Sequence, residues 1–188
     1  FTRSGPQVVQ GLHALGFEVF LDLKFHDIPN TTAMAVKAAA EMGVWMVNVH
    51  CSGGLKMMQA CREVLDQHQG QKPLLIGVTV LTSMDQEQLN AIGLEVTPAQ
   101  QVSRLARLTE ESGLAGVVCS PLEIELIRRE RSADFITVVP GIRPAGAAVG
   151  DQKRIMTPAL AAKAGASYIV VGRPIIAAPD PVAAAEAV

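Results

Sequence analysis

The sequence has no surplus of positive charge and no long apolar run, and each absence excludes a class of protein. Sixteen Lys and Arg residues stand against 18 Asp and Glu residues, so the formal net charge is −2. That balance argues against a nucleic-acid-binding surface. No uninterrupted apolar run reaches the ~20 residues that a membrane-spanning helix needs. We therefore expect neither a nucleic acid nor a membrane as a partner.

Cysteine is scarce, and neither cysteine nor histidine is grouped. The three cysteines form no CxxC pair, and the four histidines form no HExxH-like pattern. A disulfide framework and a dedicated metal site are therefore not indicated. Reduced, buried thiols are typical of a cytoplasmic protein, which is the location that we expect.

Short runs rich in Val, Ile and Leu alternate with helical stretches along the chain. Helix starts are marked where Thr97 and Ser120 each precede a proline, since a capping residue followed by proline favours a first helical turn. Alternating strands and helices imply a parallel sheet, either doubly wound or closed into a barrel. The six runs that predict buried strands are residues 19–25, 44–50, 74–81, 116–119, 136–139 and 168–171.

The number of strand–helix units favours an α/β fold of the (β/α)8 TIM-barrel type. Such a barrel needs eight βα units and about 200 residues or more, whereas this chain of 188 residues supplies six units. We therefore predict a single barrel domain over residues 1–188 that is N-terminally incomplete and lacks the first two strands. A complete doubly wound sheet is the alternative on pattern alone.

Three charged residues interrupt the first predicted strand, which is otherwise apolar. In an extended strand Asp22 and Lys24 point to the same face, and Asp27 follows at the strand end. Because an unpaired buried ion is costly, we expect the three charges to neutralise one another in part. An ordinary internal salt bridge is the alternative. The position at the C-terminal end of a strand favours an active site with Lys24 as a proton donor.

The ends of the last two predicted strands carry arginine and glycine. Arg143 follows one strand, and Gly172 and Arg173 follow the other. A guanidinium suits phosphate oxygens, and glycine lets the backbone approach a ligand closely. With two strands missing at the front, these would be strands seven and eight, where barrels often bind phosphate. Surface arginines in loops are the alternative.

Two hydroxyl residues, Thr82 and Ser83, directly follow the third predicted strand. Their side chains could hydrogen-bond a polar ring or a sugar. A turn held by local backbone hydrogen bonds explains them equally well.

Four segments together resemble the orotidine 5′-phosphate decarboxylase family. They are residues 22–31, 140–144, 150–152 and 172–174, and the resemblance runs through essentially the whole chain. It implies a homodimeric TIM barrel that converts orotidine 5′-phosphate to uridine 5′-phosphate and carbon dioxide, the last step of de novo pyrimidine biosynthesis. It also implies that neither a metal nor an organic cofactor takes part.

The resemblance assigns a role to each matching residue. Lys24 would protonate C6 of the pyrimidine, and Asp22 would lie against the substrate carboxylate. Asp27, with Thr31 nearby, would reach into the partner subunit's site. Thr82 and Ser83 would lie near the nucleotide, and the phosphate would be bound by Gln152 and Arg173 together with Gly172 and Arg143.

The family also has an aspartate on its first strand and a lysine at the end of its second, and neither has a match here. We therefore expect this chain to begin just after that second strand. Two other functions stay open. One is a magnesium-dependent sugar-phosphate decarboxylase or aldolase of the same superfamily, and the other is a non-catalytic module that binds a nucleotide phosphate.

Overall fold

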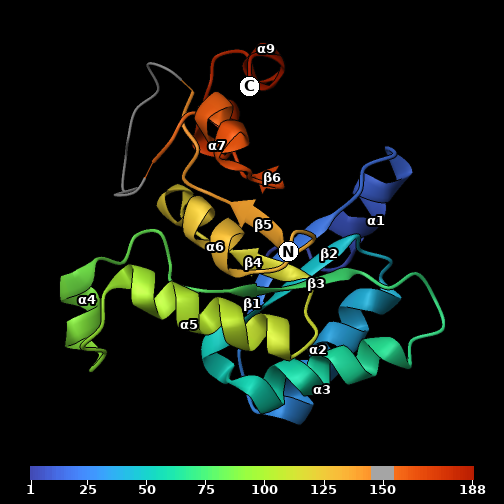
Figure 1. Cartoon of the computed structure of the whole chain (residues 1–188). Coiled ribbons are helices and arrows are strands. Elements are labelled where there is room, and N and C mark those ends of the chain that lie inside the picture. The colour runs from blue at the N-terminus through green and yellow to red at the C-terminus, as the bar shows by residue number, and fades with distance from the viewer. Residues whose placement is uncertain (145–154) are drawn as a thin grey trace. The chain divides into compact units, whose positions relative to one another are not determined.

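The computed structural model describes residues 1–144 and 155–188 (Figure 1). The contacts within the chain divide it into two compact units. The first comprises Phe1–Val78 and Leu108–Ala115, and the second comprises Thr79–Arg107 and Gly116–Val188. The existence of one barrel domain over residues 1–188 stays a prediction.

The first unit is built on three parallel strands, which pair in the order β1-β2-β3. Strand β2 (Met46–His50) is central, and its first four residues are buried. Helices α2 (Pro29–Glu41) and α3 (Leu55–Asp66) pack against each other, as Figure 1 shows. The remaining elements of this unit are α1 (Gln7–Ala14), β1 (Phe20–Phe25), the short 3-10 helix η1 (Cys51–Gly53) and β3 (Leu74–Val78).

The limits of α2 follow from its sequence. Ile28 is extended, with ψ of 154°, as expected for a residue that precedes proline. Pro29 then takes the first helical position, where its missing N–H is no loss. The helix ends before Gly43, whose φ of +75° allows the chain to reverse into β2.

The second unit also holds three parallel strands, paired in the order β4-β5-β6. They are β4 (Gly116–Val118), β5 (Ile136–Val139) and β6 (Tyr168–Ile169). Around them are α4 (Gln86–Ala91), η2 (Pro121–Glu123), α6 (Ile124–Glu130), α7 (Pro158–Ala164), α8 (Arg173–Ile176) and α9 (Pro181–Glu186). Helix α5 (Pro98–Glu111) contributes residues to both units.

Two local features define β4 and the segment after it. A Cβ atom added at Gly116 would lie 2.1 Å from the carbonyl oxygen of Ile136, so only glycine lets β4 approach β5 this closely. After the strand, Ser120 and Glu123 form a capping box that starts η2.

All six strands predicted from the sequence are present, and the alternation of strands and helices confirms the α/β class. The third strand is shorter than predicted and ends at Val78. Thr79 instead directs both its N–H and its hydroxyl to the carbonyl of Val118. In the part of the chain that the structure describes, no helix has the length and apolar character needed to cross a membrane.

Candidate active site

The site begins with an ion pair at the C-terminal half of β1. Nζ of Lys24 donates a hydrogen bond to Oδ1 of Asp22 at 2.7 Å. The two side chains are 37% and 44% exposed, respectively. An ion pair this exposed contributes at most about 1 kcal/mol to folding. Stabilisation of the fold is therefore a poor explanation for two charges in an apolar strand. The ion pair is, however, accessible to a ligand.

A bulge in β1 places these two residues. Leu21 pairs with Val47, and the next paired residues are Phe25 and Val49. Between these pairs β1 advances by four residues and β2 by two. Within that bulge Lys24 has φ of +52°, and it is the only non-glycine residue with positive φ among those described. This conformation costs about 1–2 kcal/mol for a residue with a Cβ. Such strain typically marks functional sites.

Asn48, in the middle of β2, holds the bulge from the neighbouring strand. Its Oδ1 accepts a hydrogen bond of 2.8 Å from the backbone N–H of Lys24. Its Nδ2 donates a hydrogen bond of 2.6 Å to Oδ1 of Asp22. The residue is completely buried. Sequence reasoning missed Asn48, although an amide within the apolar run Met46–His50 is a signal that could have found it.

The expected charge network of three residues is only partly formed. In the described part of the chain Lys24 pairs with Asp22 and makes no ion pair with Asp27. Instead, Oδ1 of Asp27 accepts the N–H of Ile28 at 2.7 Å, and the backbone of Asp27 is tied to the buried Thr32 hydroxyl. The spacing of these residues along the chain therefore does not by itself produce an ion pair between Asp27 and Lys24 among the described residues. Thr31 is exposed in the first turn of α2.

Two histidines lie beside the ion pair. The ring centroids of His26 and His50 are 5.4 Å apart, with the rings tilted by 42°. Burial lowers the pKa of His50 below 6.5, and electrostatic interactions with His26 and Lys24 lower it further, while Asp22 opposes them. His50 is therefore a neutral imidazole at neutral pH.

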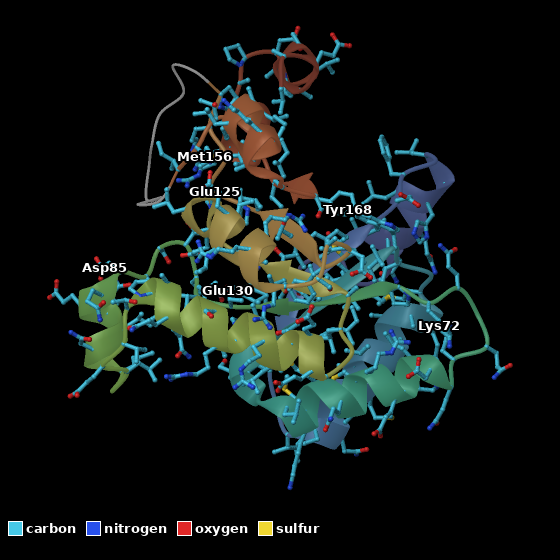
Figure 2. All side chains as sticks on the ribbon, in the orientation of Figure 1. Lys72, Asp85, Glu125, Glu130, Met156 and Tyr168 are labelled. Carbon is cyan, nitrogen blue, oxygen red and sulfur yellow. The ribbon has the colours of Figure 1, made fainter. Side chains whose placement is uncertain are left out.

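The predicted phosphate residues belong to the second unit. Strands β5 and β6 are parallel neighbours, with Val138 opposite Tyr168 and Val139 opposite Ile169. The segments that follow them, which carry Arg143 and Arg173, therefore leave the sheet at the same edge. Tyr168 is labelled in Figure 2.

Arg143 follows β5 and forms hydrogen bonds through both its backbone and its side chain. Its backbone N–H donates to the carbonyl of Met156, which Figure 2 labels, at 2.9 Å, and its Nη1 donates to the carbonyl of Ile142 at 2.8 Å. The side chain is buried, and its Nε has no hydrogen-bond partner among residues 1–144 and 155–188. A buried guanidinium with a spare donor suits an anionic ligand.

The other nucleotide-binding candidates are more open. Gly172 precedes α8, and a Cβ atom added there would meet nothing within 4 Å. Arg173 begins that helix with an exposed side chain. Thr82 is partly exposed and Ser83 is exposed, in the segment after β3. Gln152 lies outside the described residues.

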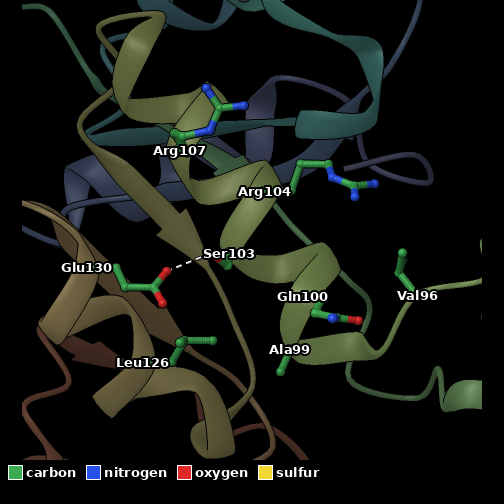
Figure 3. A pocket seen from close by; sticks show the side chains of 8 residues that line it. All are labelled: Val96, Ala99, Gln100, Ser103, Arg104, Arg107, Leu126 and Glu130. Atoms are coloured by element: carbon green, nitrogen blue, oxygen red, sulfur yellow. Dashed lines mark hydrogen bonds between the residues drawn. The ribbon is translucent and has the colours of Figure 1, made fainter.

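A separate pocket lies on α5 and α6 of the second unit and has a volume of about 460 Å³ (Figure 3). Oγ of Ser103 donates to Oε2 of Glu130 at 2.5 Å on its wall. Its other lining residues are Val96, Ala99, Gln100, Arg104, Arg107 and Leu126. None of the residues predicted from the sequence lines this pocket.

These features define an α/β protein of the barrel class, in which charged side chains follow the carboxyl ends of parallel strands. The chain belongs to the orotidine 5′-phosphate decarboxylase / HUMPS family, whose family model matches residues 1–188.

Individual relatives agree with the family match. The chain is 63% identical over 181 residues to orotidine 5′-phosphate decarboxylase of Pseudomonas fluorescens Pf-5, covering 96% of this chain and 77% of the relative. It is 62% identical over 188 residues to the enzyme of the same name from Pseudomonas putida W619, covering 100% of this chain and 80% of the relative.

Solved structures extend the agreement to the fold. The crystal structure of orotidine 5′-phosphate decarboxylase from Lactobacillus acidophilus is 41% identical, with a TM-score of 0.84, and the match covers 97% of this chain and 79% of that one. The structure from Pyrococcus horikoshii OT3 is 29% identical with a TM-score of 0.72, and the match covers 98% and 78%. The predictions of a TIM-barrel fold carrying six βα units, of the family, and of an enzyme of the carboxy-lyase class are thereby confirmed.

Proposed function

We propose that the protein decarboxylates orotidine 5′-phosphate to uridine 5′-phosphate in the cytoplasm, as a step of de novo pyrimidine biosynthesis. The observation that carries the proposal is the accessible pair of Lys24 and Asp22, 2.7 Å apart near the carboxyl end of β1. Relatives that are 61–63% identical bear the name of this activity.

In the proposed reaction the bond between C6 and the carboxylate carbon breaks, and its electron pair stays on C6. The ammonium of Lys24 gives a proton to C6 as this charge develops, and the resulting amine regains a proton from solvent. The fixed positive charge of Lys24 stabilises the developing negative charge in place of a cofactor. The proposed reaction therefore uses neither a metal nor an organic cofactor.

Asp22 has two parts in this scheme. Its Oδ1 accepts from Nζ of Lys24 and so limits where that ammonium points. Its negative charge would also lie against the substrate carboxylate, and this repulsion would be relieved as neutral carbon dioxide leaves.

The nucleotide's phosphate is the proposed anchor. Arg143 and Arg173 supply guanidinium groups, Gly172 leaves the backbone open, and Gln152 adds an amide. The buried Arg143 with its spare Nε supports this assignment. Thr82 and Ser83 would hydrogen-bond the pyrimidine or ribose. Binding energy gained at the phosphate would orient C6 far from it.

We further propose a homodimer in which Asp27 and Thr31 enter the partner's site. Both side chains are exposed, and Asp27 forms no ion pair with Lys24 of its own chain within the described residues. A second carboxylate supplied across the interface would complete the charge array that the sequence suggested.

The test is decarboxylation of orotidine 5′-phosphate by the purified protein, followed by ultraviolet absorbance with and without a chelator. We expect turnover that the chelator leaves unchanged. Activity that disappears with the chelator and returns with Mg²⁺ would favour the sugar-phosphate decarboxylase or aldolase alternative. Binding of uridine 5′-phosphate without any turnover of orotidine 5′-phosphate would favour a non-catalytic module.

A further inference from the structure

The bulge in β1 leaves a gap in the ladder of hydrogen bonds that Asn48 fills with its side chain. Residues 22–24 lie between the paired positions Leu21–Val47 and Phe25–Val49, so they face Asn48 alone. In a regular parallel ladder, the N–H of Lys24 would meet a backbone carbonyl of β2. Here it meets Oδ1 of Asn48 at 2.8 Å.

We propose that Asn48 is the positioning residue of the Asp22–Lys24 pair, because its one amide holds the backbone of Lys24 and the carboxylate of Asp22 together. The inference rests on the proposed decarboxylation. Asn48 touches the two groups on which that reaction depends and is itself completely buried, so it acts through them.

The chemistry of the carboxamide explains the choice of residue. The N–H of Lys24 requires an acceptor, which orients Oδ1 toward it and leaves Nδ2 facing Asp22. Among side chains of this size, only a carboxamide presents an acceptor and a donor from one planar group. Aspartate would offer two acceptors and an added charge, and leucine would offer neither bond.

Oδ1 of Asp22 consequently receives two donors. Nδ2 of Asn48 lies 2.6 Å away and Nζ of Lys24 lies 2.7 Å away. The bond from Asn48 holds the carboxylate so that the same oxygen stays directed at the ammonium. The hydrogen bond to the N–H of Lys24 stabilises the backbone conformation of positive φ that directs the Lys24 side chain. Without Asn48 both ends of the pair would be free to shift.

The test compares Asn48→Leu and Asn48→Asp with the wild-type protein, using Thr109→Val as the matched control. Thr109 is equally buried in the same unit, and its hydroxyl bonds to Cys51 rather than to the ion pair. Each variant is measured for kcat, KM, binding of uridine 5′-phosphate, melting temperature and the pH dependence of kcat.

For Asn48→Leu we expect kcat to fall about 100-fold, the effect of a small misplacement of reacting groups. We expect KM and the binding of uridine 5′-phosphate to stay within about threefold of wild type, because ground-state binding is not what the residue supports.

For Asn48→Asp we expect both the acidic and the basic limb of the pH profile of kcat to move to higher pH. The new carboxylate beside Asp22 makes one of the two retain a proton at higher pH, which moves the acidic limb up. The added negative charge also holds the proton on Lys24 to higher pH, which moves the basic limb up. Thr109→Val should lower the melting temperature and move neither limb.

Several outcomes would overturn the proposal. One is a kcat within about threefold of wild type for Asn48→Leu. Another is a pH profile of Asn48→Asp that coincides with that of the wild type, since a purely structural role changes stability but not the limbs. If the wild type turns over orotidine 5′-phosphate normally, these results reject only the role of Asn48 and not the proposed function. Absence of turnover in the wild type would instead reject the proposed function, and with it the reaction that Asn48 is proposed to support.

Discussion

The ammonium of Lys24 lies 2.7 Å from Oδ1 of Asp22, and the backbone of Lys24 has a φ of +52°. A lysine with a strained backbone next to an accessible carboxylate is an energetically unfavourable way to form a surface ion pair. The arrangement is better explained by the reaction that it would serve, and the first prediction addresses this.

Replacing Lys24 by alanine should remove the proposed proton donor while sparing the fold. We expect kcat for orotidine 5′-phosphate to fall by about 10⁴-fold, the upper end of what a positioned general acid contributes. The binding of uridine 5′-phosphate should stay measurable by calorimetry. Lys37→Ala is the control, because Lys37 is an exposed lysine of α2 that pairs with Glu41. Near-normal turnover in Lys24→Ala would reject the assigned role.

Replacing Arg173 by alanine should weaken binding through the phosphate alone. We expect KM for orotidine 5′-phosphate to rise at least about tenfold, while the slow reaction of orotidine, which lacks the phosphate, stays unchanged. The control is Arg129→Ala, since Arg129 is an exposed arginine of α6 near Glu130. An equal loss with both substrates would contradict a phosphate contact.

Gly116→Ala tests the close approach of β4 and β5. The added Cβ would lie 2.1 Å from the carbonyl oxygen of Ile136, so the strands must separate. We expect the free energy of unfolding to fall by about 1–3 kcal/mol, or more if the strands cannot move. Urea unfolding measures it.

Gly11→Ala is the matched control for that variant. Gly11 lies in α1, and a Cβ atom added there meets nothing within 4 Å. Alanine should therefore stabilise the helix by about 0.5–1 kcal/mol. Equal effects of the two substitutions would show that β4 and β5 tolerate separation.

The lowered pKa of His50 predicts a loss of folding stability in mild acid. Its pKa in the folded protein lies below 6.5 because of burial first and electrostatic interactions with His26 and Lys24 second. The unfolded chain therefore binds a proton that the folded chain does not. The resulting contribution to stability is fully present above pH 6.5 and is lost as pH falls through 6.5 toward the lowered pKa.

The measurement compares the free energy of unfolding of the wild type and His50→Gln at several pH values on both sides of 6.5. Over the range just below that value, the wild type should lose stability more steeply than the variant as the pH falls. Parallel curves for the two proteins would show that His50 titrates alike in the folded and unfolded states.

Much of the fold could be predicted from local patterns. Apolar runs located all six strands, and Thr97 and Ser120, each followed by proline, marked the starts of α5 and η2. Asp22 and Lys24, which the sequence placed on one face of an extended strand, are hydrogen-bonded, but they pair within a bulge in which Lys24 is not extended. These features succeed because side-chain periodicity and the conformational limits of proline act over a few residues.

The sequence by itself determined which strands form and which charges stand at the end of the first one. Only the tertiary structure decided how those charges are held. It put a bulge opposite Asn48, bonded the Asp27 carboxylate to the N–H of Ile28 and buried Arg143. Asn48 is 24 residues from Lys24, so its role depends on the pairing of two strands. Strand pairing depends on contacts between distant residues, and no local pattern of side chains encodes where a bulge in that pairing falls.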